Sequence, residues 1–296
     1  DGVLQGIEVL TAAGEIFDLA CNQLLLAIGH SARDTFEMLH QSGIHLEAKP
    51  FSVGARIEHS QALINKSQYG KFASHPALGA ADYKLAVHYP DGRSAYTFCM
   101  CPGGEVVAAA SEINRVVTNG MSRHARDGQN ANAALLVGVD ARDFGAESPL
   151  SGMYFQRKLE ENAFIHGGKN YRAPAQLVGD FLKNIPSRKL GSVQPSYTPG
   201  VTLANLAEVL PPSIISTMRR AISDMDKKLR GFASYDAVLT GVETRSSSPV
   251  RIVRGENLQS VSCQGLFPIG EGAGYAGGIS SAGADGVRAA VFVVNN

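Results

Sequence analysis

Three glycines near the C-terminal end of the chain have a spacing that can bind a phosphate group. Gly272, Gly274 and Gly277 form the pattern G-x-G-x-x-G, between an apolar run typical of a strand and small residues typical of a helix. Glycine lets the backbone approach a pyrophosphate closely, and free N–H groups at a helix start face the anion. Only 19 residues follow Gly277 (296 minus 277), too few for the rest of a nucleotide-binding βαβ unit. The pattern is therefore either a ligand-binding turn or a turn required only for close helix–strand packing.

Two cysteines are the other candidates for chemistry. Cys99 and Cys101 lack the C-x-x-C spacing of a redox pair, and no second cysteine or histidine pair completes a zinc site. The simplest interpretation is a structural pair on a strand, with one side chain facing the interior and one facing solvent. The alternative is that Cys101, beside Pro102-Gly103-Gly104, lies near a bound ligand and takes part in redox chemistry, provided that its pKa is lowered. A disulfide or a metal ligand is the third interpretation.

Two further chemistries do not fit the spacing of the residues. Gly278-Ile-Ser280-Ser-Ala-Gly283 has the wrong glycine spacing for the nucleophile elbow of hydrolases. The eight histidines form no H-E-x-x-H or comparable pattern, so we expect no metal site.

The elements that would position these residues follow both helix and strand patterns. Residues 3–10 and 15–20 predict a hairpin, and the apolar run from Leu24 to Ile28 predicts a strand buried on both faces. Residues 35–40 predict a short helix. Further strands are predicted at 53–59, 84–89, 94–100, 105–110, 237–244 and 250–253, and further helices at 152–165, 174–185, 212–229 and at the C-terminal end. The fold class predicted from this pattern is α/β.

Composition excludes several classes of protein. The chain has 27 Lys plus Arg and 27 Asp plus Glu, a balance that argues against nucleic acid as a partner. No apolar run approaches the roughly 18 residues needed to cross a bilayer, so no membrane association is expected. Four cysteines in 296 residues do not make a disulfide framework, which predicts a reducing, cytoplasmic setting.

Two segments resemble the FAD-contacting parts of glutathione-reductase-type flavoproteins. Phe267-Pro-Ile-Gly-Glu271-Gly-Ala-Gly-Tyr275-Ala-Gly-Gly-Ile279 is similar to their second FAD segment, in which an acidic residue of the turn binds a hydroxyl of the cofactor. Glu271 stands at that acidic position. Leu24-Leu-Leu-Ala-Ile-Gly29-His-Ser-Ala-Arg-Asp34 looks like the strand end that returns the chain to the FAD domain, with Ile28 where threonine is usual.

The middle of the chain resembles a narrower group, the predicted bacterial FAD-dependent dehydrogenases. Four motifs carry this likeness: Cys99-Met-Cys101-Pro-Gly-Gly104, Val117-Thr-Asn-Gly-Met121, Asn130-Ala-Asn-Ala-Ala134 and Tyr171-Arg-Ala-Pro-Ala-Gln176. Such flavoproteins open with a strand and a G-x-G-x-x-G turn, and nothing of the kind precedes residue 20 here. The resemblance therefore implies that this chain is the C-terminal part of a longer flavoprotein. The adenosine half of the FAD site would then be missing from this chain.

The resemblance also implies a division of the chain and a set of cofactor-binding residues. Residues 1–34 and 252–296 would be the remnant of a Rossmann-like FAD-binding domain, and 35–251 a substrate or cap domain inserted in it. The cofactor-binding candidates are Gly29, His30, Ser31, Arg33, Gly270, Glu271, Gly272, Ala273, Gly274, Tyr275, Gly277, Gly278 and Ile279. Cys101, near the flavin ring, is the one candidate for a catalytic residue.

The resemblance implies that this chain is one part of an oxidoreductase. The longer parent would be a dehydrogenase that uses FAD to move a hydride to or from a small molecule. We expect this chain by itself to hold FAD weakly or not at all, and to be inactive. The alternative is a stand-alone binding or interaction module that lacks both flavin and catalysis.

Overall fold

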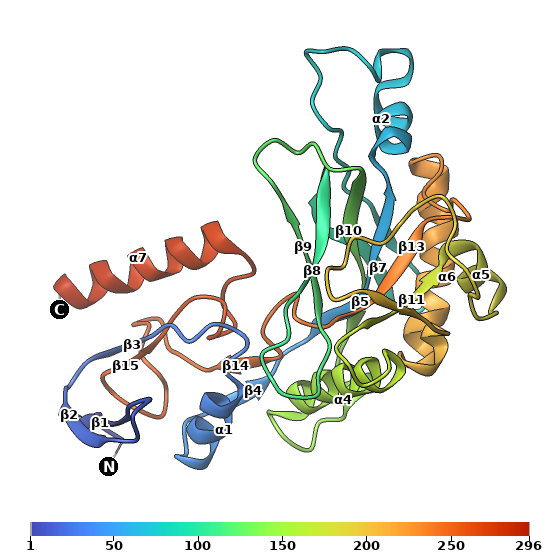
Figure 1. The fold of residues 1–296 in the computed structure, drawn as a ribbon. Coiled ribbons are helices and arrows are strands. Elements are labelled where there is room, and N and C mark those ends of the chain that lie inside the picture. The colour runs from blue at the N-terminus through green and yellow to red at the C-terminus, as the bar shows by residue number, and fades with distance from the viewer. Residues whose placement is uncertain (1, 296) are drawn as a thin grey trace. The chain divides into compact units, whose positions relative to one another are not determined.

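The computed structural model describes residues 2–295, which form two compact units (Figure 1). Unit 1 contains the described residues up to Phe51, Asp140–Tyr154 and those from Ser247 onward. Unit 2 contains Ser52–Val139 and Phe155–Ser246. Helices and strands are mixed, and the largest sheet has strands running in both directions, which confirms the α/β class. The division into an FAD-binding remnant and a substrate domain at residues 34 and 252 stays a prediction.

Unit 2 is built on a seven-stranded sheet (Figure 1). Its strands are, in spatial order, β12 (Val201–Leu203), β11 (Ala173–Leu177), β13 (Val238–Glu243), β5 (Phe51–Ser60), β10 (Asn130–Val139), β7 (Ser94–Cys101) and β6 (Ala86–His88). β11 and β12 are parallel, whereas β11–β13, β13–β5, β10–β7 and β7–β6 are antiparallel. The two longest strands, β5 and β10, lie at the centre and are buried along almost their whole length.

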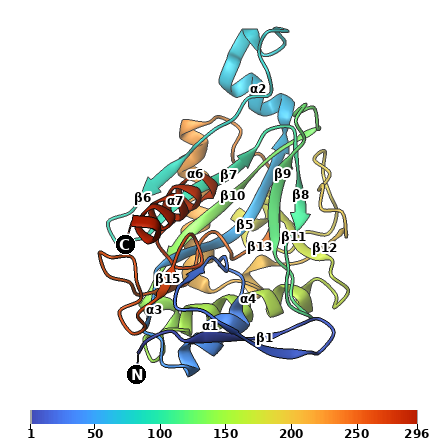
Figure 2. The ribbon, with the colours of Figure 1, turned by 90° about the vertical axis from the view of Figure 1, so that its left-hand side faces the viewer.

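The faces of this sheet are covered by a helix and a hairpin (Figure 2). Helix α6 (Pro212–Lys228) packs against β6, β7 and β10 through its apolar side, which includes Ile214, Met218 and Ile222. The hairpin of β8 (Gly104–Ala108) and β9 (Thr118–Ser122) lies on the other face, against β7, β10 and β13. Unit 2 also contains α2 (Gln61–Tyr69), most of α4 (Ser151–His166), α5 (Val178–Lys183) and 3₁₀ turns at Gly70–Phe72 and Leu206–Glu208.

Unit 1 has three small sheets of two strands each. β1 (Gly6–Leu10) and β2 (Ile16–Ala20) form the predicted hairpin, β4 (Leu46–Ala48) pairs with β14 (Val250–Ile252), and β3 (Leu24–Leu26) pairs in parallel with β15 (Leu266–Pro268). The helices are α1 (Arg33–Gln41), α3 (Ala141–Phe144) and α7 (Ile279–Asn295). The pairing of β3 with β15 brings segments from both ends of the sequence together, because β15 lies about 240 residues after β3.

Two predictions about local structure were wrong. Residues 174–185 were expected to form one helix beginning at Pro174, but Pro174 lies in strand β11, and α5 begins only at Val178. β11 is held between two neighbouring strands and is buried throughout, so tertiary pairing overrides the helix-start preference of proline. β3 is only half-buried, with Leu25 43% exposed, and is not a strand covered on both faces.

None of the helices between residues 2 and 295 is both long enough and apolar enough to cross a bilayer.

Candidate functional site

The glycine-rich turn of unit 1 follows β15 and leads directly into α7. Gly270 and Gly274 have positive φ angles of 74° and 83°, the left-handed region that glycine adopts without strain. A Cβ atom on Gly274 would lie 2.8 Å from the carbonyl oxygen of Val250, so no side chain fits there. Gly270, Gly272 and Gly274 are buried; Gly272 and Gly274 serve close packing inside unit 1, whereas Gly270 is required by its positive φ.

A second turn lies directly beside the first. It begins at Gly29 after β3, and because β3 and β15 are parallel neighbours, the turns that follow them lie at the same edge of the small sheet. A Cβ atom on Gly272 would lie 2.4 Å from the carbonyl oxygen of Gly29, which shows how closely the two backbones approach. The structure thus brings together the two segments that the sequence assigned to one site. Edges at the carboxyl ends of parallel strands are where α/β proteins bind ligands.

The accessible part of this double turn consists of glycine backbone and two titratable side chains. Around the Cα atoms of Gly29, Gly277 and Gly278 there is open space in which a Cβ atom would meet nothing within 4 Å. His30 Nε2 lies 3.9 Å from Glu271 Oε1, and both side chains are about one quarter exposed. Burial raises the pKa of Glu271, although Lys49 acts in the opposite direction. The surface therefore offers open backbone next to one half-buried carboxyl group.

The remaining predicted residues divide between the interior and the surface. Tyr275 and Ile279 are 38% and 94% exposed, whereas Ala273 is buried and Arg33 is only 2% exposed. Ser31 Oγ lies 2.9 Å from His30 Nδ1, so Ser31 holds the imidazole ring in place rather than presenting its hydroxyl freely. The side chain of Arg33 supports unit 1 from within.

Asp285 of α7 holds the double turn together, and the sequence did not identify it. It accepts hydrogen bonds from both terminal nitrogens of Arg254, at 2.6 and 2.9 Å, and from the backbone N–H of Gly270, at 2.8 Å. The hydrogen bonds from Arg254 keep the pKa of Asp285 below its usual value. Arg254 also lies over the ring of Tyr275, with its guanidinium carbon 4.1 Å from the ring centroid. The signal in the sequence that could have identified Asp285 was an acidic residue within a predicted helix of small residues.

Unit 2 contains a buried guanidinium at the centre of its sheet. Arg56 of β5 is fully buried and pairs with Glu243 of β13, through Nε and, at 3.1 Å, through Nη2. Its other donors reach the carbonyl oxygen of Cys99 at 2.7 Å, Asn119 Oδ1 at 2.8 Å and Asn132 Oδ1 at 3.2 Å. All five N–H donors of the guanidinium therefore have an acceptor. Burial raises the pKa of Glu243, although Arg56 opposes this shift.

This cluster joins three of the motifs that the sequence analysis found separately. Cys99, Asn119 and Asn132 come from the cysteine motif and the two asparagine motifs, and the guanidinium of Arg56 donates a hydrogen bond to each of them. Gly120 makes this possible, since a Cβ atom there would lie 2.5 Å from Arg56 Nη1. Sequence reasoning missed Arg56, and the signal was a charged residue in the middle of an otherwise apolar strand pattern.

The two cysteines of β7 differ sharply in environment. Cys99 is exposed, whereas Cys101 is 6% exposed and donates its thiol hydrogen to the carbonyl oxygen of Cys99 at 3.3 Å. A hydrogen bond from Cys101 lowers the pKa of Cys99 to about 5, against the effect of burial and with help from Arg56. The same hydrogen bond and burial raise the pKa of Cys101. The position favours a thiolate at Cys99, while the predicted redox role of Cys101 stays a prediction.

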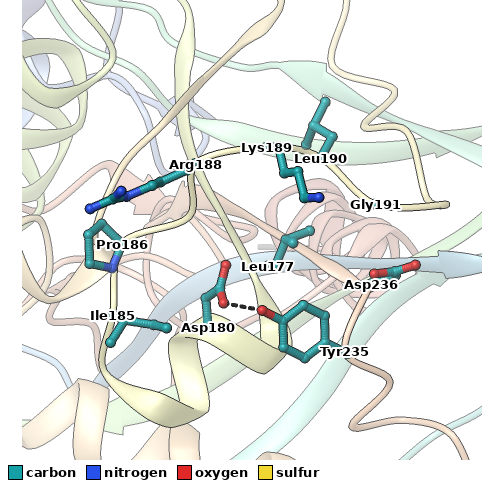
Figure 3. A pocket seen from close by; sticks show the side chains of 10 residues that line it. All are labelled: Leu177, Asp180, Ile185, Pro186, Arg188, Lys189, Leu190, Gly191, Tyr235 and Asp236. Atoms are coloured by element: carbon teal, nitrogen blue, oxygen red, sulfur yellow. Dashed lines mark hydrogen bonds between the residues drawn. The ribbon is translucent and has the colours of Figure 1, made fainter.

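A pocket of about 450 Å³ lies elsewhere in unit 2 (Figure 3). Its lining includes Asp180, which accepts hydrogen bonds from the hydroxyl of Tyr235 and, at 2.6 Å, from Ser187. Both bonds fix the carboxylate, and the bond between Tyr235 and Asp180 raises the pKa of Tyr235. The exposed side chains of Arg188 and Lys189 come from the segment that passes over the Asp180–Tyr235 pair in Figure 3. The size and mixed charge suit a small polar molecule.

Between residues 2 and 295, no group of three or more His, Cys, Asp or Glu side chains is arranged to hold a metal ion.

Comparison with known proteins gives two matches. Residues 50–246 match a family model described as "FAD-dependent protein, C-terminal domain-like". An uncharacterized protein of Clostridium beijerinckii is 53% identical over 278 residues, which are 94% of this chain and 52% of that protein. The chain therefore spans about half the length of this relative, and the family match covers all of unit 2.

Proposed function

The chain belongs to the FAD-dependent protein, C-terminal domain-like family, and we propose that it forms the C-terminal portion of an FAD-dependent oxidoreductase. In this proposal a hydride moves between the flavin and a small molecule bound by unit 2. The observation that carries the proposal is the juxtaposition of the turns after β3 and β15, with open backbone at Gly29, Gly277 and Gly278. FAD would supply the hydride chemistry, which amino-acid side chains cannot perform.

The residues of the double turn fit the cofactor that the family implies. The open glycine backbone leaves room for a ligand to approach, and Glu271 is half-buried beside it, where a carboxylate can accept a hydrogen bond from a hydroxyl group. The start of α7 has backbone N–H groups directed out of the helix, which favour an anion. In this proposal Gly29, Glu271, Gly277 and Gly278 hold the cofactor, and Asp285 with Arg254 keeps the turn in shape.

The pocket of unit 2 is our candidate for the binding site of the small molecule. Asp180 and Tyr235 are fixed by hydrogen bonds, so they can orient a polar ligand without first being ordered. Arg188 and Lys189 add positive charge at its rim.

The test is flavin retention by the purified chain. We expect the protein to retain only a weak flavin absorption band through gel filtration after incubation with excess FAD, and Gly277→Val and Glu271→Gln to retain less than the parent chain. Gly286→Ala is the matched control, since a Cβ atom there also meets nothing within 4 Å but lies on α7 beyond the turn. Equal retention in all four proteins would overturn the assignment of these residues.

A second candidate function is a binding module without flavin. The observation that favours it is that the pocket and the buried Arg56 cluster both form within unit 2 alone. No flavin retention by a folded chain, together with small-molecule binding that is lost in Tyr235→Phe, would favour this function over the first.

A further inference from the structure

We propose that Cys99 and Cys101 form a redox-active dithiol, in which the Cys99 thiolate attacks a small hydroperoxide and the Cys101 thiol resolves the product to a disulfide. This inference does not rest on the proposed flavin chemistry. It rests on the backbone conformation at Cys99, on the hydrogen bond from the Cys101 thiol to that backbone and on the charge placed beside the two residues.

The backbone of β7 is irregular at Cys99. In the pairing of β7 with β10, Cys101 lies opposite Asn132 and Phe98 opposite Ala134, so two residues of β7, Cys99 and Met100, face one residue of β10. Cys99 has a φ of +43°, a left-handed conformation that costs a non-glycine residue about 1 kcal/mol or more. Such conformations persist only where the surroundings enforce them, and they are concentrated at functional sites.

Two hydrogen bonds enforce this conformation. The carbonyl oxygen of Cys99 accepts from Arg56 Nη1 at 2.7 Å and from the Cys101 thiol at 3.3 Å. The Cys101 thiol therefore lies against the backbone of Cys99, two residues away along the same strand. This proximity favours an intramolecular disulfide between the two residues.

The charges around the pair select Cys99 as the attacking group. The titratable or charged side chains that interact with it are Cys101 on its own strand, Arg56 on β5 and Glu243 on β13. The Cys101 hydrogen bond and the Arg56 charge favour a thiolate, whereas the Glu243 carboxylate is occupied by its two bonds to Arg56. Cys99 is exposed and can meet a reagent, while Cys101 is buried and has a raised pKa, so Cys99 is the better nucleophile of the two.

The reaction balances with these two residues and the peroxide alone. The Cys99 thiolate attacks one peroxide oxygen, the O–O bond breaks, and the departing hydroxide takes a proton to become water. Cys99 is then a sulfenic acid. The Cys101 sulfur attacks the Cys99 sulfur, the S–OH bond breaks, and the hydroxide leaves as water with the Cys101 proton. Two thiols and one hydroperoxide thus give one disulfide, one water and one water or alcohol.

The first test measures thiol reactivity in the full chain. Iodoacetamide is applied at pH 6, and the rate at each cysteine is followed by peptide mass spectrometry. Cys21 and Cys263, which lie in unit 1 and are half-buried, are internal references. We expect Cys99 to react about tenfold or more faster than either reference, because reactivity follows the thiolate fraction. Equal rates at the three cysteines would overturn the proposal.

The second test identifies the product. With equimolar hydrogen peroxide, we expect a peptide in which Cys99 and Cys101 are joined and have lost two hydrogens. In Cys101→Ser the Cys99 sulfenic acid should accumulate and be trapped by dimedone, and in Cys99→Ser neither product should form. Both substitutions are conservative, and circular dichroism checks the fold. A disulfide absent from the peroxide-treated parent chain, or dimedone labelling of Cys101→Ser at residues other than Cys99, would contradict the assignment.

Discussion

The two units of this chain are stabilised in different ways. Unit 2 has a seven-stranded sheet with a continuous buried centre, and even its charged groups, Arg56 and Glu243, are paired inside it. Unit 1 has only sheets of two strands, and several of its apolar side chains are largely exposed. These exposed side chains are Leu10, Ile16, Phe17, Leu19, Leu25, Ile279, Val287, Val291 and Val294.

This difference separates stability from binding. Unit 2 pairs the buried charges of Arg56 and Glu243, so a change at this pair should cost folding energy. Unit 1 leaves glycine backbone and one carboxyl group accessible at its double turn, so a change there should cost ligand affinity first. The following predictions test this contrast, beginning with the largest expected effect.

Removing the buried cation of unit 2 should have the largest effect. Arg56→Met leaves the Glu243 carboxyl buried without its counter-charge and should lower the free energy of unfolding by about 3–5 kcal/mol. The matched control is Arg123→Met, which removes an exposed pair with Glu105 in the same unit and should cost no more than about 1 kcal/mol. Chemical denaturation measures both. Similar losses in the two variants would mean that burial does not determine how much an ion pair contributes to the free energy of unfolding.

The stability of unit 2 should depend on pH through His59. Burial lowers the pKa of His59 to about 4, and its Nε2 lies 2.8 Å from the carbonyl oxygen of Phe232. The unfolded chain binds the proton near pH 6.5, so stability falls as the pH drops from about 6.5 to about 4, by a total on the order of 3 kcal/mol. Denaturation across this range should show the loss, and His59→Gln should flatten it. An unchanged slope in that variant would assign the pH dependence to other groups.

Breaking the anchor of the double turn should have a smaller and local effect. Asp285→Ala leaves Arg254 without its carboxylate and should destabilise unit 1 by about 2 kcal/mol. Because the folded pKa of Asp285 is depressed, its contribution is fully present above its unfolded pKa of roughly 3.9 and is lost as the pH falls through the lower folded value. Hydrogen exchange at the Gly270 amide should rise in the variant. Unchanged protection there would contradict the anchoring role.

Two glycines of the same turn should respond differently to alanine. Gly274→Ala meets the Val250 carbonyl at 2.8 Å in a left-handed conformation and should cost about 1–2 kcal/mol of stability. Gly277→Ala meets open space and should change stability by less than about 0.5 kcal/mol. Thermal unfolding separates them. If Gly277→Ala destabilised the chain as much as Gly274→Ala, the turn would be a packing feature throughout.

A small gain of stability, rather than a loss, is expected on the open side of α7. Gly286 lies inside the helix with open space around its Cα atom, so Gly286→Ala should stabilise unit 1 by about 0.5–1 kcal/mol through helix propensity. Thermal unfolding measures the gain. A loss of stability would show that this side of α7 is packed against other atoms.

Much of the fold could be predicted from local patterns. The hairpin near the N-terminus, the apolar side of α6 and the terminal helix follow directly from residue spacing, because each pattern lies within a single element. β11 was predicted wrongly because its strand pairs come from β12 and β13, which are distant in sequence. The resemblance identified both turns of unit 1, but only the fold distinguished its buried glycines from its open ones.

The sequence by itself determined the α/β class and the two glycine-containing turns, because these depend on short-range spacing and on backbone freedom. The tertiary structure decided which groups meet. It paired Arg56 with Glu243, 187 residues further along, joined three separate motifs around one guanidinium, and gave the exposed position to Cys99 and the buried one to Cys101. The electrostatic environment of a thiol depends on its neighbours in space, so its reactivity can be predicted only once the pairing of the strands is known.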